Sequence, residues 1–254
     1  MVTAPDDLLW ARGLHYEHEG TPALRDVCLS VRAGEIVSVT GPRGSGKSTL
    51  LGCLSGRLVP GRGEVWFDGL PVHTLTASAR ERLRRGRFGW IGSEPHLLPE
   101  LTVWENTALP LLLSGAGRRE ARRRACEWLE RLDVGDFARS RPGALVQAQR
   151  QRVAIARALA HSPSVVFADE PTARLHQGER AQVLRTLTTA ARSHRITVVL
   201  ASHDARVAGV ADRSAVLVDG RRVGEDAPSG VPAGTTGPSA GPGPEGRTEC
   251  SLSV

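Results

Sequence analysis

Lysine is almost absent from this sequence of 254 residues. Of its 33 basic residues one is lysine, Lys47, and all the others are arginine. Tyrosine and methionine also occur once each, and aromatic residues make up 4% of the chain. Because lysine is avoided everywhere else, the position at which it is kept is the first place to look for a function.

Long apolar runs are missing as well. No stretch approaches the roughly 18–20 residues that a membrane-spanning helix needs; the run at 109–113 is short and contains Pro110. The N-terminus, MVTAPDDLLW, carries acids where a secretory leader carries bases, and no long apolar core follows. The four cysteines lie far apart without a C-x-x-C pair, which excludes a zinc ribbon. We therefore expect a chain that neither crosses a membrane nor is exported.

Three short β-branched runs organise the chain, at 36–40, 165–168 and 196–201. Each is apolar nearly throughout, as expected for strands covered on both faces of a largely parallel sheet. Between them lie amphipathic, arginine-rich segments that predict helices at 76–85, 118–132, 148–160 and 178–193. The alternation predicts an α/β fold with a mostly parallel sheet and an inserted helical subdomain at about 88–160.

The two ends of the chain differ from this pattern. Near the start, 24–31 and 63–68 predict an antiparallel β portion. The last 30 residues, 225–254, hold 6 Gly and 5 Pro with no hydrophobic period. Such a segment buries too little apolar surface to offset the entropy of ordering. We therefore expect a folded domain at 1–224 and a disordered tail at 225–254.

The first β-branched run leads directly into GPRGSGKST, residues 41–49. This segment matches G-x-x-x-x-G-K-[ST] between a predicted strand and a predicted helix, the context that a phosphate-binding loop requires. Glycines let consecutive backbone N–H groups face one anion, and the following helix adds the positive end of its dipole. The predicted phosphate-binding residues are Gly41, Pro42, Arg43, Gly44, Ser45, Gly46, Lys47, Ser48 and Thr49.

Polar side chains also follow the other two runs. Asp169 and Glu170 end the second run, and His203 follows the third. Open α/β sheets bind ligands at the carboxyl ends of their strands, so these groups are expected to meet at the phosphate loop. Ser48 and Asp169 are suited to Mg²⁺, Glu170 to polarising an attacking water, and His203 to a γ-phosphate contact. The chain has no N-K-x-D element, which argues against a guanine nucleotide.

Together GPRGSGKST, VVFADEPTARL and VVLASHD resemble the nucleotide-binding subunit of an ABC transporter. The stretch LLPELTVWENTALPLLLSG, 97–115, is similar more narrowly to the subgroup serving lipoprotein release, macrolide and antimicrobial-peptide export, and cell division. The resemblance covers about 8–224. It implies an ABC-type P-loop NTPase fold, ATP and Mg²⁺ as cofactors, and ATP hydrolysis that powers a separate membrane permease, with export the expected direction. It also implies a dimer of ATP-binding chains, on the cytoplasmic side of the cell membrane.

In that family an aromatic residue before the first long strand stacks on adenine, and the matching residue is Tyr16. The family's LSGGQ signature, with which one chain contacts ATP held by the other, corresponds to LVQAQ, 145–149. Val146 has no hydroxyl, and Gln147 has a long side chain where the backbone must come close. Ser93 stands at the position of the family's Q-loop glutamine, and His176 at that of its D-loop aspartate.

These departures leave two interpretations open. The first is an ATP-hydrolysing subunit in a homodimer or heterodimer that powers a permease. The alternative is an ATP-binding subunit deficient in hydrolysis, which regulates a partner chain or a membrane protein. A DNA-repair ATPase of the same family is the weaker third choice, because such proteins usually carry coiled-coil or zinc insertions that this sequence lacks.

Arginines cluster at 80–87 and 118–124. No aromatic residues are interleaved with them and no recognition module is evident, so we expect no nucleic-acid partner. A solvated helix face and a contact with anionic lipid headgroups both remain compatible with these clusters.

Overall fold

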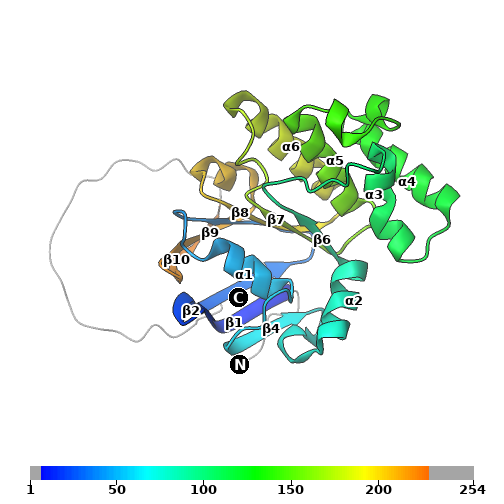
Figure 1. Ribbon diagram of the computed structural model, residues 1–254. Coiled ribbons are helices and arrows are strands. Elements are labelled where there is room, and N and C mark those ends of the chain that lie inside the picture. Colours follow the sequence, from blue (N-terminus) through cyan, green and yellow to red (C-terminus); the bar gives the residue numbers. More distant parts are fainter. Residues whose placement is uncertain (1–6, 229–254) are drawn as a thin grey trace, which may run out of the picture.

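The structure, a computed structural model, describes residues 7–228 (Figure 1). Its larger sheet has six strands in the order β10-β9-β3-β8-β7-β6, parallel except for the β9–β10 pair. The strands of this sheet are β3 (Ile36–Thr40), β6 (Phe88–Ile91), β7 (Val165–Asp169), β8 (Thr197–Ser202), β9 (Arg213–Val218) and β10 (Arg221–Pro228).

A smaller, antiparallel sheet packs below it in Figure 1. Its strand order is β2-β1-β4-β5. The strands are β1 (Asp7–His18), β2 (Thr21–Arg32), β4 (Arg62–Phe67) and β5 (Leu70–Pro71). The predicted antiparallel portion is thus confirmed as β2 and β4, and β1, which the sequence analysis did not predict, lies between them.

Helix α1 (Lys47–Leu54) is buried between the two sheets (Figure 1). Leu50, Leu51 and Leu54 belong to a core that includes residues from both sheets. Val165 and Phe167 of β7 face this core, while Val166 and Ala168 face the opposite one. Both faces of β7 are therefore covered, which explains why its sequence is apolar throughout.

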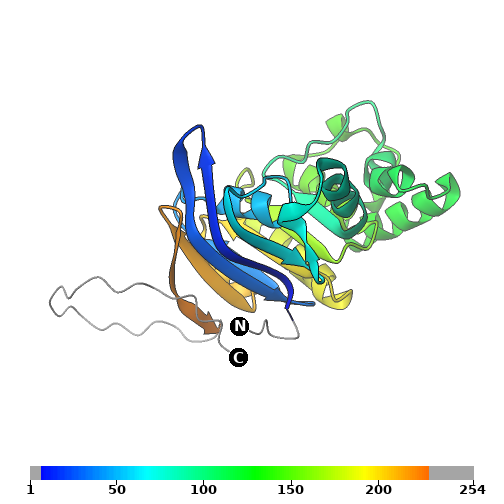
Figure 2. The same ribbon diagram turned by 90° about the horizontal axis from the view of Figure 1, so that it is seen from below.

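The opposite core lies under four helices. Figure 2 shows the green segment, which contains α3, α4 and α5, gathered at one side of the molecule, beyond the edge strand β6. The helices of this layer are α3 (Val103–Leu113), α4 (Arg118–Arg131), α5 (Gln147–Leu159) and α6 (Gln177–Ser193). Apolar residues of α5 and α6 pack with those of the larger sheet.

The remaining elements are short or lie in connections. Helix α2 (Ala77–Arg87) leads into β6. The 3-10 helices in the described residues are η1 (Val72–Thr74), η2 (Gly135–Phe137), η3 (Pro142–Ala144) and η4 (Ala205–Val210). Within residues 7–228 no helix is long and apolar enough to cross a membrane.

The predicted elements agree with these assignments, with two corrections. Residues 88–91 form β6, which pairs with β7 in the larger sheet, so the helical part begins after this strand rather than at 88. Gly89 fits this position because a Cβ there would lie 2.5 Å from the carbonyl oxygen of Ala158. Strand β10 continues to Pro228, four residues beyond the predicted end of the folded domain. The rest of the predicted tail, 229–254, lies outside the described residues.

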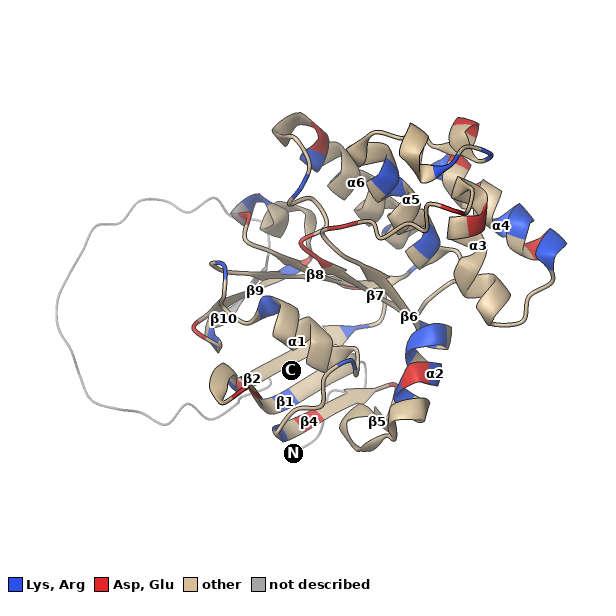
Figure 3. Cartoon of the chain, in the orientation of Figure 1, with Lys and Arg blue, Asp and Glu red and all other residues tan. Residues whose placement is uncertain are grey.

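The arginine clusters lie on α2 and α4 (Figure 3). Several of these arginines pair within their own helix, among them Arg85 with Glu81, and Arg123 with both Glu120 and Glu127. Such i,i+3 and i,i+4 pairs stabilise an exposed helix modestly. Such pairing is typical of a solvated helix face.

Asn106 holds the start of α3 to the loop that precedes it. Its side chain is fully buried and accepts a hydrogen bond from the N–H of Leu98 at 2.7 Å. Its amide donates to the carbonyl oxygens of Leu98, Leu101 and Thr102 at 3.0–3.2 Å. One buried side chain thus bonds to four backbone groups of the segment from Leu98 to Thr102.

Replacing Asn106 with alanine should lower the free energy of unfolding by at least about 2 kcal/mol, because the Leu98 N–H loses its partner inside the protein. Urea denaturation measures this. Ser114→Ala, which removes an exposed hydroxyl bonded to Pro110, is the control and should change stability by less than about 0.5 kcal/mol. Equal effects of the two changes would contradict the role given to Asn106.

Candidate nucleotide site

The loop between β3 and α1 can be built only from glycine at its two tightest positions. Gly41 and Gly46 have φ angles of 147° and 97°. A Cβ at Gly41 would lie 2.0 Å from the carbonyl oxygen of Leu217, and one at Gly46 would lie 2.4 Å from that of Ala23. The loop is thus pressed against β9 and β2, which fixes the path of its backbone N–H groups.

Lys47 begins α1 and is held inside this loop. Its side chain is buried, with 5% of the residue surface exposed. Nζ donates to the carbonyl oxygens of Gly41 at 2.9 Å and Pro42 at 2.7 Å, and to Ser45 Oγ at 3.4 Å. Burial lowers the pKa of Lys47, and Glu170 and Asp169 oppose that shift. The ammonium group lies at the N-terminus of α1. Its positive charge and the positive end of the helix dipole therefore both favour binding of an anion here.

Ser48 and Asp169 form an oxygen pair beside the lysine. Ser48 Oγ donates to Asp169 Oδ1 at 3.0 Å. Burial raises the pKa of Asp169, and the Ser48 hydrogen bond partly offsets this. A hydroxyl and a carboxylate are hard oxygen donors, and Mg²⁺ in phosphate sites commonly takes one or two carboxylates together with ligand phosphates. The donor set fits Mg²⁺; in the described residues no group of three or more His, Cys, Asp or Glu forms a protein-only metal cage.

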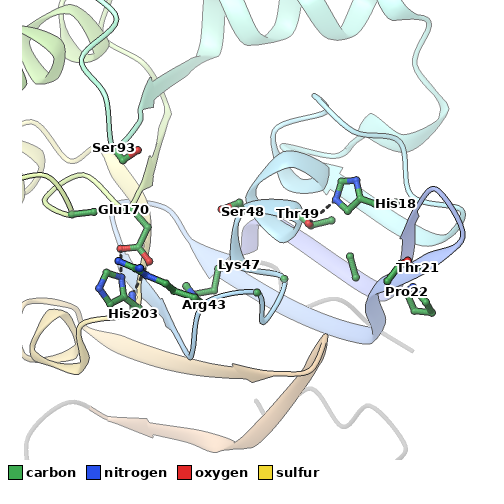
Figure 4. Close-up of a pocket in the computed structure, with 14 residues that line it drawn as sticks. His18, Thr21, Pro22, Arg43, Lys47, Ser48, Thr49, Ser93, Glu170 and His203 are labelled. Atoms are coloured by element: carbon green, nitrogen blue, oxygen red, sulfur yellow. Dashed lines mark hydrogen bonds and ion pairs between the residues drawn. The ribbon is translucent and has the colours of Figure 1, made fainter.

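Glu170 is held in a strained backbone conformation at the end of β7. Its φ is 50°, in the left-handed region, and its N–H donates to the carbonyl oxygen of Ala201 at 2.9 Å. The backbone N–H of His203 donates to Oε1 at 2.8 Å. Oε2 accepts from His203 Nδ1 at 2.9 Å and from Ser202 Oγ at 3.2 Å. Three donors at the end of β8 thus fix the direction of this carboxylate; Figure 4 shows Glu170 beside His203.

These groups line a cavity of about 520 Å³. In Figure 4, Ser93, Glu170 and His203 lie at one end, and His18, Thr21 and Pro22 of the β1–β2 hairpin at the other. Lys47 and Ser48 lie between them. Its phosphate-loop residues thus lie between the carboxylate end and the hairpin end.

Most of the predicted site residues meet here. The lining includes Arg43, Gly44, Gly46, Lys47, Ser48, Thr49, Glu170 and His203. Gly41, Pro42 and Ser45 are not among the lining residues, but their oxygen atoms accept hydrogen bonds from the lysine. Asp169 bonds to Ser48 and lines an adjoining cavity with Ser93.

Tyr16 is placed differently from the expectation. It is not among the lining residues and packs against the core between the sheets. Its ring meets His18 edge-on, with 4.8 Å between ring centroids. His18 lines the cavity, with 3.1 Å between its Nε2 and Thr49 Oγ1. The sequence analysis missed His18, as well as the other hairpin residues Thr21, Pro22 and Ala23.

The residues that depart from the family pattern fall into two groups. Ser93 lines the cavity. Val146, Gln147 and His176 do not; Val146 precedes the first turn of α5, and His176 that of α6. Val146 is 61% exposed, and its N–H donates to Gln149 Oε1 at 3.0 Å. A valine side chain has no acceptor, so Val146 cannot cap the first-turn N–H groups of α5, and Gln149 satisfies only the N–H of Val146 itself.

The raised pKa of Asp169 gives a pH-dependent prediction. The folded state holds the proton more tightly than the unfolded chain, so the ionised carboxylate lowers stability above the folded pKa. This disadvantage disappears as the pH falls through that pKa. Asp169→Asn should therefore raise the Tm of the nucleotide-free protein at neutral pH, and the difference should shrink as the pH approaches 3.8, the ordinary value.

Thermal unfolding over a pH series tests this, with Asp136→Asn as an exposed control that should leave the Tm unchanged. A lower Tm for Asp169→Asn at every pH would mean that the Ser48 hydrogen bond and the nearby cations outweigh the burial of the carboxylate.

The sequence of this chain is similar to proteins of one known family. The ABC transporter family model matches residues 24–173. The chain is 40% identical over 219 residues to the lipoprotein-releasing system ATP-binding protein LolD 2 of Caulobacter vibrioides, covering 85% of this chain and 96% of that protein. It is 41% identical over 236 residues to the macrolide export ATP-binding/permease protein MacB of Rhodopseudomonas palustris. That match covers 90% of this chain and 35% of the relative.

A similar solved structure is an ATP-binding cassette in a dimeric, post-hydrolysis state with ADP and Pi. The TM-score is 0.78 at 33% identity, over 88% of this chain and 99% of that one. The cbiO1 protein of Clostridium perfringens, part of the ABC transporter complex cbiONQ, matches with a TM-score of 0.79 at 27% identity. That match covers 86% of this chain and 87% of the other.

Proposed function

Because this chain belongs to the ABC transporter family and is an ATP-binding ATPase of it, we propose that it hydrolyses MgATP in the Lys47 cavity to drive a separate membrane permease. The observation that carries this assignment is the convergence of Lys47, Ser48, Asp169 and Glu170 where β3 and β7 end. The reaction is ATP and water to ADP and phosphate.

The phosphate loop supplies the binding step. The N–H groups of residues 41–49, the N-terminus of α1 and the Lys47 ammonium would surround the β- and γ-phosphates. Ser48 and Asp169 would hold Mg²⁺, which when bound neutralises phosphate charge. The carbonyl contacts of Lys47 keep its side chain inside the loop, so it needs no large reorientation to meet an anion.

Glu170 is the proposed base. Its carboxylate lies in the cavity lining with His203, and it would accept a proton from the water that attacks the γ-phosphate. His203 Nδ1 donates to Glu170, and the other side of the ring would contact the γ-phosphate. The two side chains would then act as a connected unit, with Ser202 fixing the carboxylate from β8.

The partner is inferred from the relatives. LolD 2, which this chain matches over 96% of its length, is named as the ATP-binding protein of a lipoprotein-releasing system. MacB is named as an ATP-binding/permease protein, and this chain spans about a third of it. We therefore assign this chain to the ATP-binding part of an export or release system, bound to a permease polypeptide at the cytoplasmic face of the cell membrane.

The similar cassette solved with ADP and Pi is a dimer, and we extend that assembly to this chain. The family resemblance then sets Val146 and Gln147 of one chain opposite the nucleotide of the other. A homodimer would carry this altered signature at both nucleotide sites, and a heterodimer at one.

The decisive experiment uses two variants of the full chain. Lys47→Ala should weaken ATP binding by at least about tenfold, since it removes a charge-assisted contact to phosphate. Glu170→Gln should keep ATP binding and lower turnover by about 100-fold or more, because the base is lost while the shape is kept. Calorimetry and phosphate release measure the two effects, with the exposed Glu100→Gln as the control.

ATP binding that survives Lys47→Ala would contradict the assignment of the cavity. Unchanged turnover and transport in Glu170→Gln would show that the chain acts as a nucleotide-dependent regulator rather than as the motor.

The nucleobase should lie at the hairpin end of the cavity. Since Glu170 and His203 define the γ-phosphate end, the base extends toward His18, Thr21 and Pro22. His18→Ala should then weaken ATP binding by about fivefold or more, the usual effect of losing a ring that stacks on a base. Binding of inorganic tripolyphosphate, which has no base, should not change.

Tyr16→Leu keeps an apolar side chain in the core and is the matched comparison. A larger loss of ATP affinity in Tyr16→Leu than in His18→Ala would restore Tyr16 as the adenine contact and contradict the assignment to His18.

A further inference from the structure

Two loops at the γ-phosphate end of the cavity are joined by an ion pair. Ser93 of one loop and Ala173 of the other line the cavity. The next residue in each loop, Glu94 and Arg174, pair with each other through Glu94 Oε1 and Arg174 Nη2. Their side chains are 41% and 59% exposed. A solvent-accessible ion pair thus connects the two loops that form this end of the cavity.

The loop that carries Ser93 is also held from behind by α5. Gln151, which is 1% exposed, donates from Nε2 to the carbonyl oxygen of Gly92 at 2.9 Å. Arg157 donates to the carbonyl oxygens of Pro95 at 2.6 Å and His96 at 2.9 Å. Both ends of the loop are therefore fixed to the helical layer, and Arg174 contacts Glu94 between them.

The loop that carries Arg174 is connected directly to Glu170. The N–H of Ala173 donates to the carbonyl oxygen of Glu170 at 3.1 Å, and that of Leu175 to Thr172 at 3.1 Å. Because these hydrogen bonds form a tight turn, a displacement of Arg174 also displaces Glu170, four residues earlier. The ion pair thus joins the Ser93 loop to the turn that begins at the proposed base.

We propose that Glu94 and Arg174 form an ionic latch that positions Ser93 relative to Glu170 during ATP hydrolysis. Both are positioning residues, since neither lines the cavity. A serine side chain is short, so the reach of its hydroxyl into the cavity depends on where the backbone is held. Small displacements at a reacting centre lower turnover much more than they lower binding. The inference rests on the proposed ATPase function of the same cavity.

The test measures kcat and KM for ATP in the full chain carrying Glu94→Gln, Arg174→Gln, or the charge-reversed pair E94R/R174E. Each single change should lower kcat by about threefold, in line with an exposed ion pair, and should leave KM within about twofold. The reversed pair should restore kcat. High salt should lower the wild-type kcat toward that of the single variants, because exposed charges are screened.

Glu81→Gln breaks a comparably exposed ion pair on α2 and should leave kcat unchanged. Hydrogen exchange gives a readout independent of turnover: amides of residues 92–96 should exchange faster in both single variants and return to the wild-type rate in the reversed pair.

Three results would overturn the latch: unchanged kcat and unchanged exchange in the single variants, a loss that charge reversal does not restore, or an effect on KM alone. Wild-type protein that neither binds nor hydrolyses ATP would instead overturn the proposed function, and the exchange measurement would still decide whether the pair holds the loop.

Discussion

The positive charge of a buried ammonium group must be balanced by nearby oxygen atoms or negative charges. The arrangement of this site follows from that requirement. Lys47 is surrounded by loop carbonyl oxygens, with Asp169 and Glu170 raising its pKa against the effect of burial. The carbonyls can take these positions because Gly41 and Gly46 let the loop press against β9 and β2. Unpaired, such a charge would be expensive to bury. Glycine, lysine and the two acids therefore form one interdependent unit.

The register of the parallel strands brings these groups together at one end of the sheet. β7 and β8 are parallel neighbours, with Asp169 opposite Ala201, and β8 pairs with β3 so that Ser202 lies opposite Thr40. Groups that are more than a hundred residues apart in the chain thereby end at the same edge. Glu170 leaves the strand with positive φ and is turned back toward β8, where Ser202 and His203 donate to it. A one-residue slip of β7 would reverse which side chains face each core.

Elements could be predicted from the sequence wherever a single local pattern determined the structure. β3 was predicted with its observed bounds, because a continuous apolar run followed by a phosphate-loop pattern has few alternatives. β1 could not be read in this way. Its pairing with β2 shifts register between Leu14 and Tyr16, and again between Tyr16 and Glu17, so alternation does not tell which side chains face the cavity. That is why the sequence pointed to Tyr16 and not to His18, which lines the cavity. β6 is four residues long and lies next to a helix-rich region, so only its pairing with β7 identifies it.

The cavity draws its walls from parts of the protein that have different cores. His18 and the phosphate loop belong to the side packed around α1, whereas Ser93 follows β6 and is tied through Gly92 to Gln151 of α5. A ligand that spans the cavity therefore touches both sides at once. Both cores pack on strands of the larger sheet, so such a contact couples the α1 side of the cavity to the helical layer through that sheet.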